Sequence, residues 1–182
     1  MSNELFKNRF LIPSARADFH DYNGGLYFIT ICTQNREHFF GEITNSIMQL
    51  SEIGQYTNKC IPKITEHNPY ARIPLWVVMP NHVHLLVAVE AGDENQWRQS
   101  IPGKNENMQK LSNHQGRLST AIGGFKQSVT RYAKEHHIPF SWQSRFHDHI
   151  VRTTAEMNKI SDYIQNNPSR WQTDTFNQPA PS

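Results

Sequence analysis

Two histidines stand one residue apart inside an apolar stretch, "WVVMPNHVHLLVAV", at residues 76–89. Side chains alternate between the two faces of a β-strand, so His82 and His84 would point the same way, about 6–7 Å apart. Two imidazoles on one face can bind one divalent cation, and a hard cation then needs further oxygen ligands. The alternative is a partly buried pair that is hydrogen-bonded to backbone carbonyls. The spacing alone does not choose between these two interpretations.

A tyrosine and an asparagine lie four residues apart in "DYIQNNP" near the C-terminus. On a helix, Tyr163 and Asn167 would project from one face, one turn apart. The amide oxygen of Asn167 is a candidate third ligand, and the phenol of Tyr163 is a candidate nucleophile. A free tyrosine has a pKa near 10, so the phenol would need a metal to polarise the group it attacks. The alternative is that Tyr163 packs in the core and that Asn167 caps the helix before Pro168.

Two further arrangements compete with these residues. His147 and His149 form a second histidine pair, "HDH", and Tyr132 with His136 repeats the tyrosine-plus-four spacing on a basic helix. The polar residue between the second pair, Asp148, gives a less regular alternation than Val83 in the first pair. We therefore rank the pair His147 and His149 below the pair His82 and His84. We also rank Tyr132 below Tyr163 as a candidate nucleophile.

The surrounding elements follow from hydrophobic periodicity and from turn and cap signals. Pro62 is expected to kink or end the first helix. The order strand, helix, strand, strand, helix, strand, helix predicts an α+β fold, a ferredoxin-like βαββαβ sandwich with a central antiparallel sheet and an added C-terminal helix. We expect strands at 24–33, 72–79 and 82–90, a short strand before residue 152 and one at 46–50, a connection at 35–43, and helices at 51–67, 118–137 and 153–168.

The chain has 182 residues, which favours a single domain over 1–182. Within it we expect an N-terminal extension (1–20), a polar loop or insertion (91–117) and a flexible tail (172–182). Neither a signal peptide nor an apolar run long enough to span a membrane is visible. We therefore expect a cytoplasmic protein with no membrane partner, and we expect its two cysteines to be reduced.

Charge is unevenly distributed along the chain. Residues 1–97 hold seven Lys or Arg and ten Asp or Glu, a net charge of −3, whereas residues 98–182 hold eleven and six, a net charge of +5. The C-terminal half is the better candidate for binding phosphates, although an ordinary solvated surface explains the same excess. The candidate DNA-binding residues are Lys126, Arg131, Lys134, Arg145 and Arg152.

Five segments, taken in order, resemble one family. "MPNHVHLLV" resembles the HUH motif (histidine, hydrophobic residue, histidine) of single-tyrosine transposases, and "YFITICTQNREHFFG" resembles the first strand of the REP-associated tyrosine transposases and their IS200-like relatives. "FKQSVTRY", "FSWQSRFHDHIVR" and "ISDYIQNNP" are similar to later segments of that family. The resemblance runs from about Asp21 to Trp171, which is most of the chain.

The resemblance implies the HUH endonuclease fold and an enzyme that cuts and rejoins single-stranded DNA, often next to a hairpin. His82 and His84 match the metal-binding pair, for Mg²⁺ or Mn²⁺, and Tyr163 matches the nucleophile that forms a 5′-phosphotyrosine intermediate. Asn167 stands where the insertion-sequence enzymes commonly have Gln, so its reach to the metal is an open question. Relatives that exchange this helix between subunits leave a homodimer open.

Two other functions remain to be separated from this one. A transposase-derived regulator would bind hairpin DNA without cutting it, and it would have no need for the complete set of two histidines, tyrosine and asparagine. A ferredoxin-like RNA-binding module would expose aromatic side chains on its sheet instead of a histidine pair.

Overall fold

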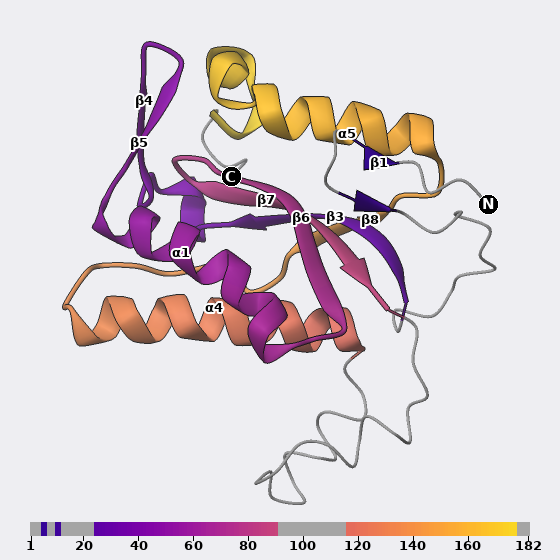
Figure 1. Ribbon diagram of the computed structural model, residues 1–182. Helices are drawn as coiled ribbons and strands as arrows, with labels where there is room; N and C mark the ends of the chain where they lie inside the picture. Colours follow the sequence, from indigo (N-terminus) through magenta and orange to yellow (C-terminus); the bar gives the residue numbers. More distant parts are fainter. Residues whose placement is uncertain (1–4, 7–9, 12–23, 91–115, 178–182) are drawn as a thin grey trace, which may run out of the picture.

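A four-stranded antiparallel sheet forms the centre of the computed structural model (Figure 1). Its spatial order is β6-β7-β3-β8, which is the strand order of a ferredoxin-like fold and confirms the predicted architecture. The strands are β3 (Gly25–Cys32), β6 (Ala71–Val78), β7 (His82–Val89) and β8 (His147–Ile150). The structure describes residues 5–6, 10–11, 24–90 and 116–177, so the predicted extension and loop lie largely outside the described residues.

The two faces of the sheet bury different layers because side chains alternate along β7. Val83, Leu85 and Val87 belong to the larger core cluster, whereas Leu86 belongs to a second, smaller cluster. The larger cluster is covered by the helices α1 (Glu52–His67) and α4 (Arg117–Glu135), and the smaller one by α5 (Thr154–Asn166). Figure 1 shows α5 on one side of the sheet and α1 with α4 on the other. Neither sheet face is therefore an open aromatic platform of the kind that an RNA-binding module uses.

Helix α1 begins as predicted and passes through the proline that was expected to disturb it. The Ser51 side chain accepts a hydrogen bond from the backbone N–H of Gly54, so Ser51 is the N-cap. Pro62 lies inside the helix, which continues to His67. The prediction of a kink or an end at Pro62 is wrong about the end, because Ile61 and Ile64 on either side of it are buried in the core and hold the helix together.

Segment 35–43, predicted as a connection, contains a strand. β4 (Gly41–Thr44) pairs with β5 (Ile47–Leu50) in a two-stranded hairpin outside the main sheet. Its turn places Asn45 and Ser46 at φ 53° and 63°, a left-handed pair that matches the twist of a hairpin. The turn lacks the glycine that normally signals it, so sequence reasoning found only the second strand.

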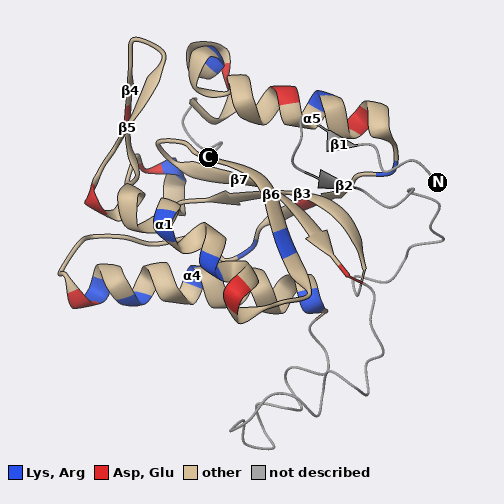
Figure 2. Ribbon diagram, viewed as in Figure 1, with Lys and Arg blue, Asp and Glu red and all other residues tan. Residues whose placement is uncertain are grey.

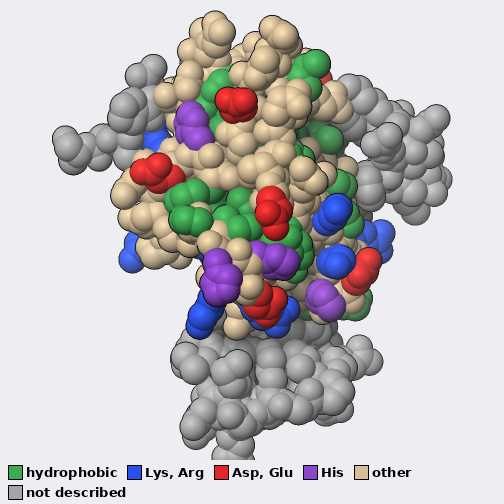
Figure 3. Space-filling model, turned by 90° about the vertical axis from the view of Figure 1, so that its left-hand side faces the viewer, with side chains coloured by type: hydrophobic (Ala, Val, Ile, Leu, Met, Phe, Trp, Pro, Cys, Tyr) green, Lys and Arg blue, Asp and Glu red, His purple; other side chains and the backbone are tan. Residues whose placement is uncertain are grey.

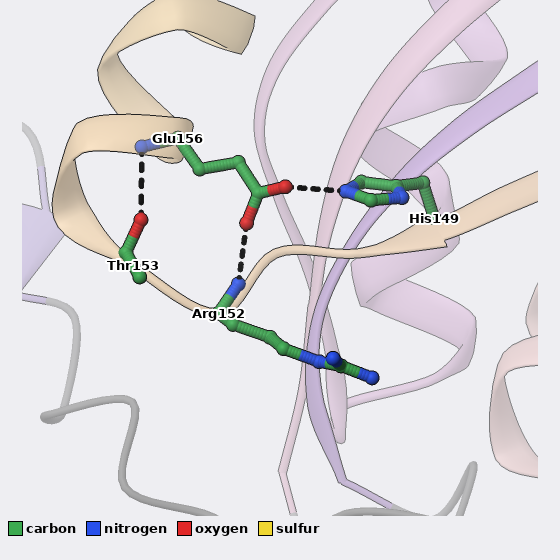
Figure 4. Close-up of polar contacts among 4 residues, drawn as sticks. All are labelled: His149, Arg152, Thr153 and Glu156. Carbon is green, nitrogen blue, oxygen red and sulfur yellow. Dashed lines mark hydrogen bonds and ion pairs between the residues drawn. The ribbon is translucent and has the colours of Figure 1, made fainter.

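Helix α5 is anchored to the edge of the sheet at its N-terminus. Thr153 caps it by accepting from the backbone N–H of Glu156, at the residue where the predicted helix begins. The Glu156 carboxylate accepts from the backbone N–H of Arg152 at 2.8 Å and contacts His149 Nε2 at 2.5 Å (Figure 4). Because His149 belongs to β8, this contact adds to the Thr153 cap and the Arg152 bond that hold the start of α5.

The segment after α5 corrects the predicted flexible tail. Residues 168–177 form two short 3₁₀ helices, η2 (Pro168–Thr173) and η3 (Thr175–Asn177), and Trp171 is buried. Only residues 178–182 of the predicted tail lie outside the described residues. At the other boundary, Arg117 is the first residue of α4 and not the last of a loop. Cys32 and Cys60 are both free and buried, and no helix within the described ranges is long and apolar enough to cross a membrane.

Candidate active site

His82 and His84 lie at the start of β7, on the sheet face that α5 covers. Both side chains are buried, with 0% and 1% of their surface exposed, and their Nε2 atoms are 3.0 Å apart. Strand alternation predicted the shared face, and the structure places both rings there. An Nε2–Nε2 separation this short means that the two nitrogens converge on one point.

Tyr163 and Asn167 reach the same place from α5 and its C-terminus. The Tyr163 ring lies edge-on to the His84 ring, with 5.2 Å between the ring centroids, and both rings contact Phe28 of β3. Asn167 is fully buried, and its Oδ1 atom has no hydrogen-bond partner among the described residues. Asn167 keeps right-handed helical φ and ψ although a proline follows it, so Pro168 does not displace the amide from the face of Tyr163.

Residues 174–176 lie over these four side chains and were missed by sequence reasoning. Asp174 Oδ2 accepts hydrogen bonds from the Tyr163 hydroxyl at 3.3 Å and from Asn167 Nδ2 at 3.2 Å. The Phe176 ring lies over His82 with 4.5 Å between the ring centroids. Neither residue stands at a spacing that points to the histidines, so no local pattern could have revealed this contact.

Burial shifts the pKa values of the two histidines and of Tyr163 in the direction that favours their neutral forms. Burial, followed by the charges of His84, Arg36 and His38, lowers the pKa of His82 well below its usual value, and burial lowers the pKa of His84 to about 3. Burial and the negative charge of Asp174 raise the pKa of Tyr163 to about 12. At neutral pH the imidazoles are therefore uncharged and able to act as ligands, and the raised pKa of Tyr163 makes its phenol harder to ionise than a free tyrosine.

Replacing Asp174 by Asn is expected to lower the pKa of Tyr163 from about 12 towards the ordinary tyrosine value of about 10, because the nearby negative charge is removed while the side-chain shape is kept. Since unfolded tyrosine ionises near pH 10, the wild type should lose stability as the pH rises from 10 to 12, and the variant should lose less. NMR titration of the tyrosine Cζ resonances of the metal-free protein, assigned with Tyr163→Phe, measures the shift. Asp162→Asn on the exposed side of α5 is the matched control, and an equal titration of Tyr163 in all three proteins would contradict the expectation.

The donor set is chemically suited to a divalent cation. Two neutral imidazoles converge, and the buried Asn167 Oδ1 is an acceptor without a donor, which normally costs stability unless a cation or a donor satisfies it. In the part of the chain that the structure describes, no three His, Cys, Asp or Glu side chains gather in a metal-binding cluster. The amide oxygen of Asn167 is a candidate third protein ligand, with water or substrate oxygens completing the shell.

The basic residues predicted on α4 do not share the face of the histidines. Lys126, Arg131 and Lys134 lie along a helix that packs on the opposite side of the sheet (Figure 2). Lys126 Nζ donates to the backbone carbonyls of Gln143 at 2.6 Å and Ser144 at 3.3 Å, which gives it a structural role. Arg131 and Lys134 are exposed, so they remain candidates for phosphate contacts away from the histidines.

Arg145 and Arg152 flank the edge strand β8, and both are exposed. Only the backbone N–H of Arg152 is used by Glu156; its guanidinium extends away from that carboxylate (Figure 4). Figure 3 shows another face of the molecule, where side chains of both charges and histidines surround hydrophobic ones, so no uniformly basic patch covers that face.

The competing residues occupy different surroundings. His147 and His149 pair in register with Thr30 and Phe28 of β3, which places them on the same sheet face as the first pair, but both are exposed at the edge. Tyr132 lies on α4, on the opposite side of the sheet, where its ring stacks between Tyr56 and His136. Neither arrangement combines a converging histidine pair with a tyrosine.

Comparison with known proteins finds similar sequences, although no family model matches the chain. An uncharacterised protein of Haemophilus influenzae is 32% identical over 163 residues, covering 88% of this chain and 90% of the relative. A second protein of that organism, provisionally named a REP-associated tyrosine transposase, is 28% identical and covers 84% and 74%. The REP-associated tyrosine transposase of Escherichia coli is 25% identical and covers 80% and 67%.

A solved structure shares the fold. The structure of a REP-associated tyrosine transposase bound to a REP hairpin matches with a TM-score of 0.51 and 20% identity, over 86% of this chain and 73% of the other. This likeness supports the arrangement of four antiparallel strands and helices described above.

Proposed function

Because this chain belongs to the family of REP-associated tyrosine transposases, we propose that it cuts and rejoins single-stranded DNA next to hairpins, with Tyr163 as the nucleophile. The observation that carries the proposal is the contact of Tyr163 with the converging histidine pair within one subunit. The Tyr163 ring contacts His84, the two histidine Nε2 atoms face each other, and Asn167 is joined to Tyr163 through Asp174. This convergence favours an HUH-type site in which the tyrosine acts within its own chain.

The proposed reaction is a transesterification at phosphorus. The Tyr163 hydroxyl gives up its proton and its oxygen forms a bond to the phosphorus, while the bond from phosphorus to the 3′ oxygen breaks. The 5′ phosphate stays on the protein, and the departing 3′ oxygen takes up one proton, which balances the one lost by the phenol. A divalent cation, Mg²⁺ or Mn²⁺, held by His82, His84 and Asn167 would neutralise the charge that grows on the phosphate. Another 3′ hydroxyl can reverse the step, because the energy of the broken ester is kept in the phosphotyrosine.

DNA must displace residues 174–176 to reach this site. Phe176 lies over His82, and Asp174 occupies the Tyr163 hydroxyl. Removal of Asp174 from the phenol also removes a negative charge that opposes its ionisation. Opening this segment would thus expose the histidines and make the tyrosine easier to deprotonate in a single movement.

The same contacts favour a second candidate function, a hairpin-DNA-binding regulator that no longer cuts. In the arrangement observed, Asp174 contacts the phenol and Phe176 lies over His82, which suits a protein whose chemistry is shut off. The basic residues Arg131, Lys134, Arg145 and Arg152 would serve DNA binding equally in either case.

Incubation with single-stranded oligonucleotides that carry a hairpin and randomised flanks tests the two functions against each other. We expect a covalent protein–DNA adduct in Mg²⁺ or Mn²⁺ and none in EDTA, and peptide mass spectrometry should place the nucleotide on Tyr163. Hairpin binding without an adduct at any metal concentration would establish the regulator instead. An adduct on another residue would refute the assignment of the nucleophile.

A further inference from the structure

Asn81 fixes which nitrogen of His82 carries the proton. The Asn81 Nδ2 atom lies 3.2 Å from the backbone carbonyl oxygen of Arg36 and 2.8 Å from that of Phe176. A carbonyl oxygen only accepts hydrogen bonds, so the donating nitrogen of the amide must face these two oxygens. The Asn81 Oδ1 atom therefore faces His82 Nδ1, 2.8 Å away, and accepts its proton. His82 then carries its proton on Nδ1, and its Nε2 holds a lone pair.

The second histidine must have the opposite arrangement when no cation is present. The Nε2 atoms of His84 and His82 are 3.0 Å apart, and His82 Nε2 carries a lone pair. A second lone pair on His84 Nε2 would repel it at that distance. A proton on His84 Nε2 removes the repulsion by donating to His82. His84 Nδ1 then accepts from the hydroxyl of Thr30, whose Oγ1 is 2.9 Å away.

A cation reverses the requirement at His84. Both Nε2 atoms are available to a cation only if each ring carries its proton on Nδ1. The His84 proton must then move to Nδ1, and Thr30 Oγ1 must accept where it had donated. A hydroxyl can do both, because it has one donor and two lone pairs and rotates freely. Thr30 is buried and lies directly opposite His84 in the register of β3 and β7.

We propose that Asn81 and Thr30 are positioning residues for cation binding: Asn81 holds His82 permanently in the ligand tautomer, and Thr30 lets His84 change tautomer when a cation arrives. The inference deepens the proposed function and rests on it. The same Asn81 amide also donates to the Phe176 carbonyl, so it helps to hold the segment that covers the site.

Isothermal titration of the full chain with Mn²⁺ alone tests the role of Thr30. Thr30→Val keeps the shape and the strand preference but removes the hydroxyl, so His84 Nδ1–H would be buried without an acceptor. Loss of such an outer partner is expected to weaken Mn²⁺ binding about 10- to 100-fold. Thr30→Ser restores the hydroxyl and should bind within a few-fold of the wild type. Equal Mn²⁺ affinity in all three folded proteins would overturn the inference.

His82→Ala separates this inference from the proposed function. If His82→Ala abolishes Mn²⁺ binding while Thr30→Val leaves it unchanged, the metal site stands and the role of Thr30 fails. If His82→Ala binds Mn²⁺ like the wild type, the proposed metal site fails, and with it the role of both positioning residues.

Nitrogen-15 NMR of the metal-free wild type needs no variant and tests the tautomers directly. We expect His82 to carry its proton on Nδ1 and His84 on Nε2, two opposite tautomers on one strand. Asn81→Ala should let His82 populate both forms. A His82 proton found on Nε2 in the wild type would overturn the inference, whatever the titrations give.

Discussion

Tyr163→Phe is expected to abolish the covalent protein–DNA adduct, by ~10³-fold or more, while hairpin binding stays within a few-fold of the wild type. Phenylalanine keeps the ring that packs against Phe28 and His84 and loses only the hydroxyl that contacts Asp174. The fold should therefore be unaffected. Denaturing gel electrophoresis with end-labelled oligonucleotides measures the adduct, and a mobility shift measures binding.

The rival tyrosine supplies the matched control for this experiment. Tyr132→Phe removes a hydroxyl that donates to Glu52 on the opposite side of the sheet, and we expect full adduct yield from it. An undiminished adduct from Tyr163→Phe, or its loss from Tyr132→Phe alone, would move the nucleophile to the other helix.

His82→Ala is expected to reduce metal-dependent cleavage about 100-fold or more, because it removes a converging donor that would hold the charge-stabilising cation. The residual activity should not recover at high metal concentration, since the remaining imidazole alone cannot complete the site. Initial rates of adduct formation across a series of Mn²⁺ and Mg²⁺ concentrations give the measurement. Thermal unfolding of the variant shows whether the cavity left by the buried ring has disturbed the fold.

The second histidine pair provides the control for the first. His149 is exposed and contacts Glu156 at the start of α5, so His149→Ala keeps every converging group of the proposed site. We expect its cleavage rate to remain within a few-fold of the wild type. A loss as large as that of His82→Ala would place the metal at the edge strand instead.

Most of the fold follows from local signals, and its exceptions have identifiable causes. The strands around Tyr27 and Val83 and the caps at Ser51 and Thr153 are visible in periodicity and residue type. The first strand of the β4–β5 hairpin was not predicted, because the turn uses non-glycine residues at positive φ. The passage of α1 through Pro62 depends on core contacts with other elements, which no window of sequence contains.

The four converging side chains illustrate the same division. The sequence by itself determined that His82 and His84 share a strand face and that Tyr163 and Asn167 share a helix face, because both spacings are fixed by the geometry of a single element. The sequence also indicated the basic residues of α4 as candidates for DNA binding. Only the tertiary structure decided that the sheet separates these residues from the histidines.

Tertiary structure alone supplied the partners that tune the site. Thr30, Asp174 and Phe176 come from two separate parts of the chain and meet the histidines and the tyrosine only after the sheet has formed and α5 has docked on it. Asn81 precedes His82 directly in the sequence, but the carbonyls that orient its amide belong to the distant residues Arg36 and Phe176. Periodicity records which way a residue points within its own element. It carries no information about which distant residue will lie opposite, and the proposed tautomers of the histidines and the raised pKa of Tyr163 both depend on such distant partners.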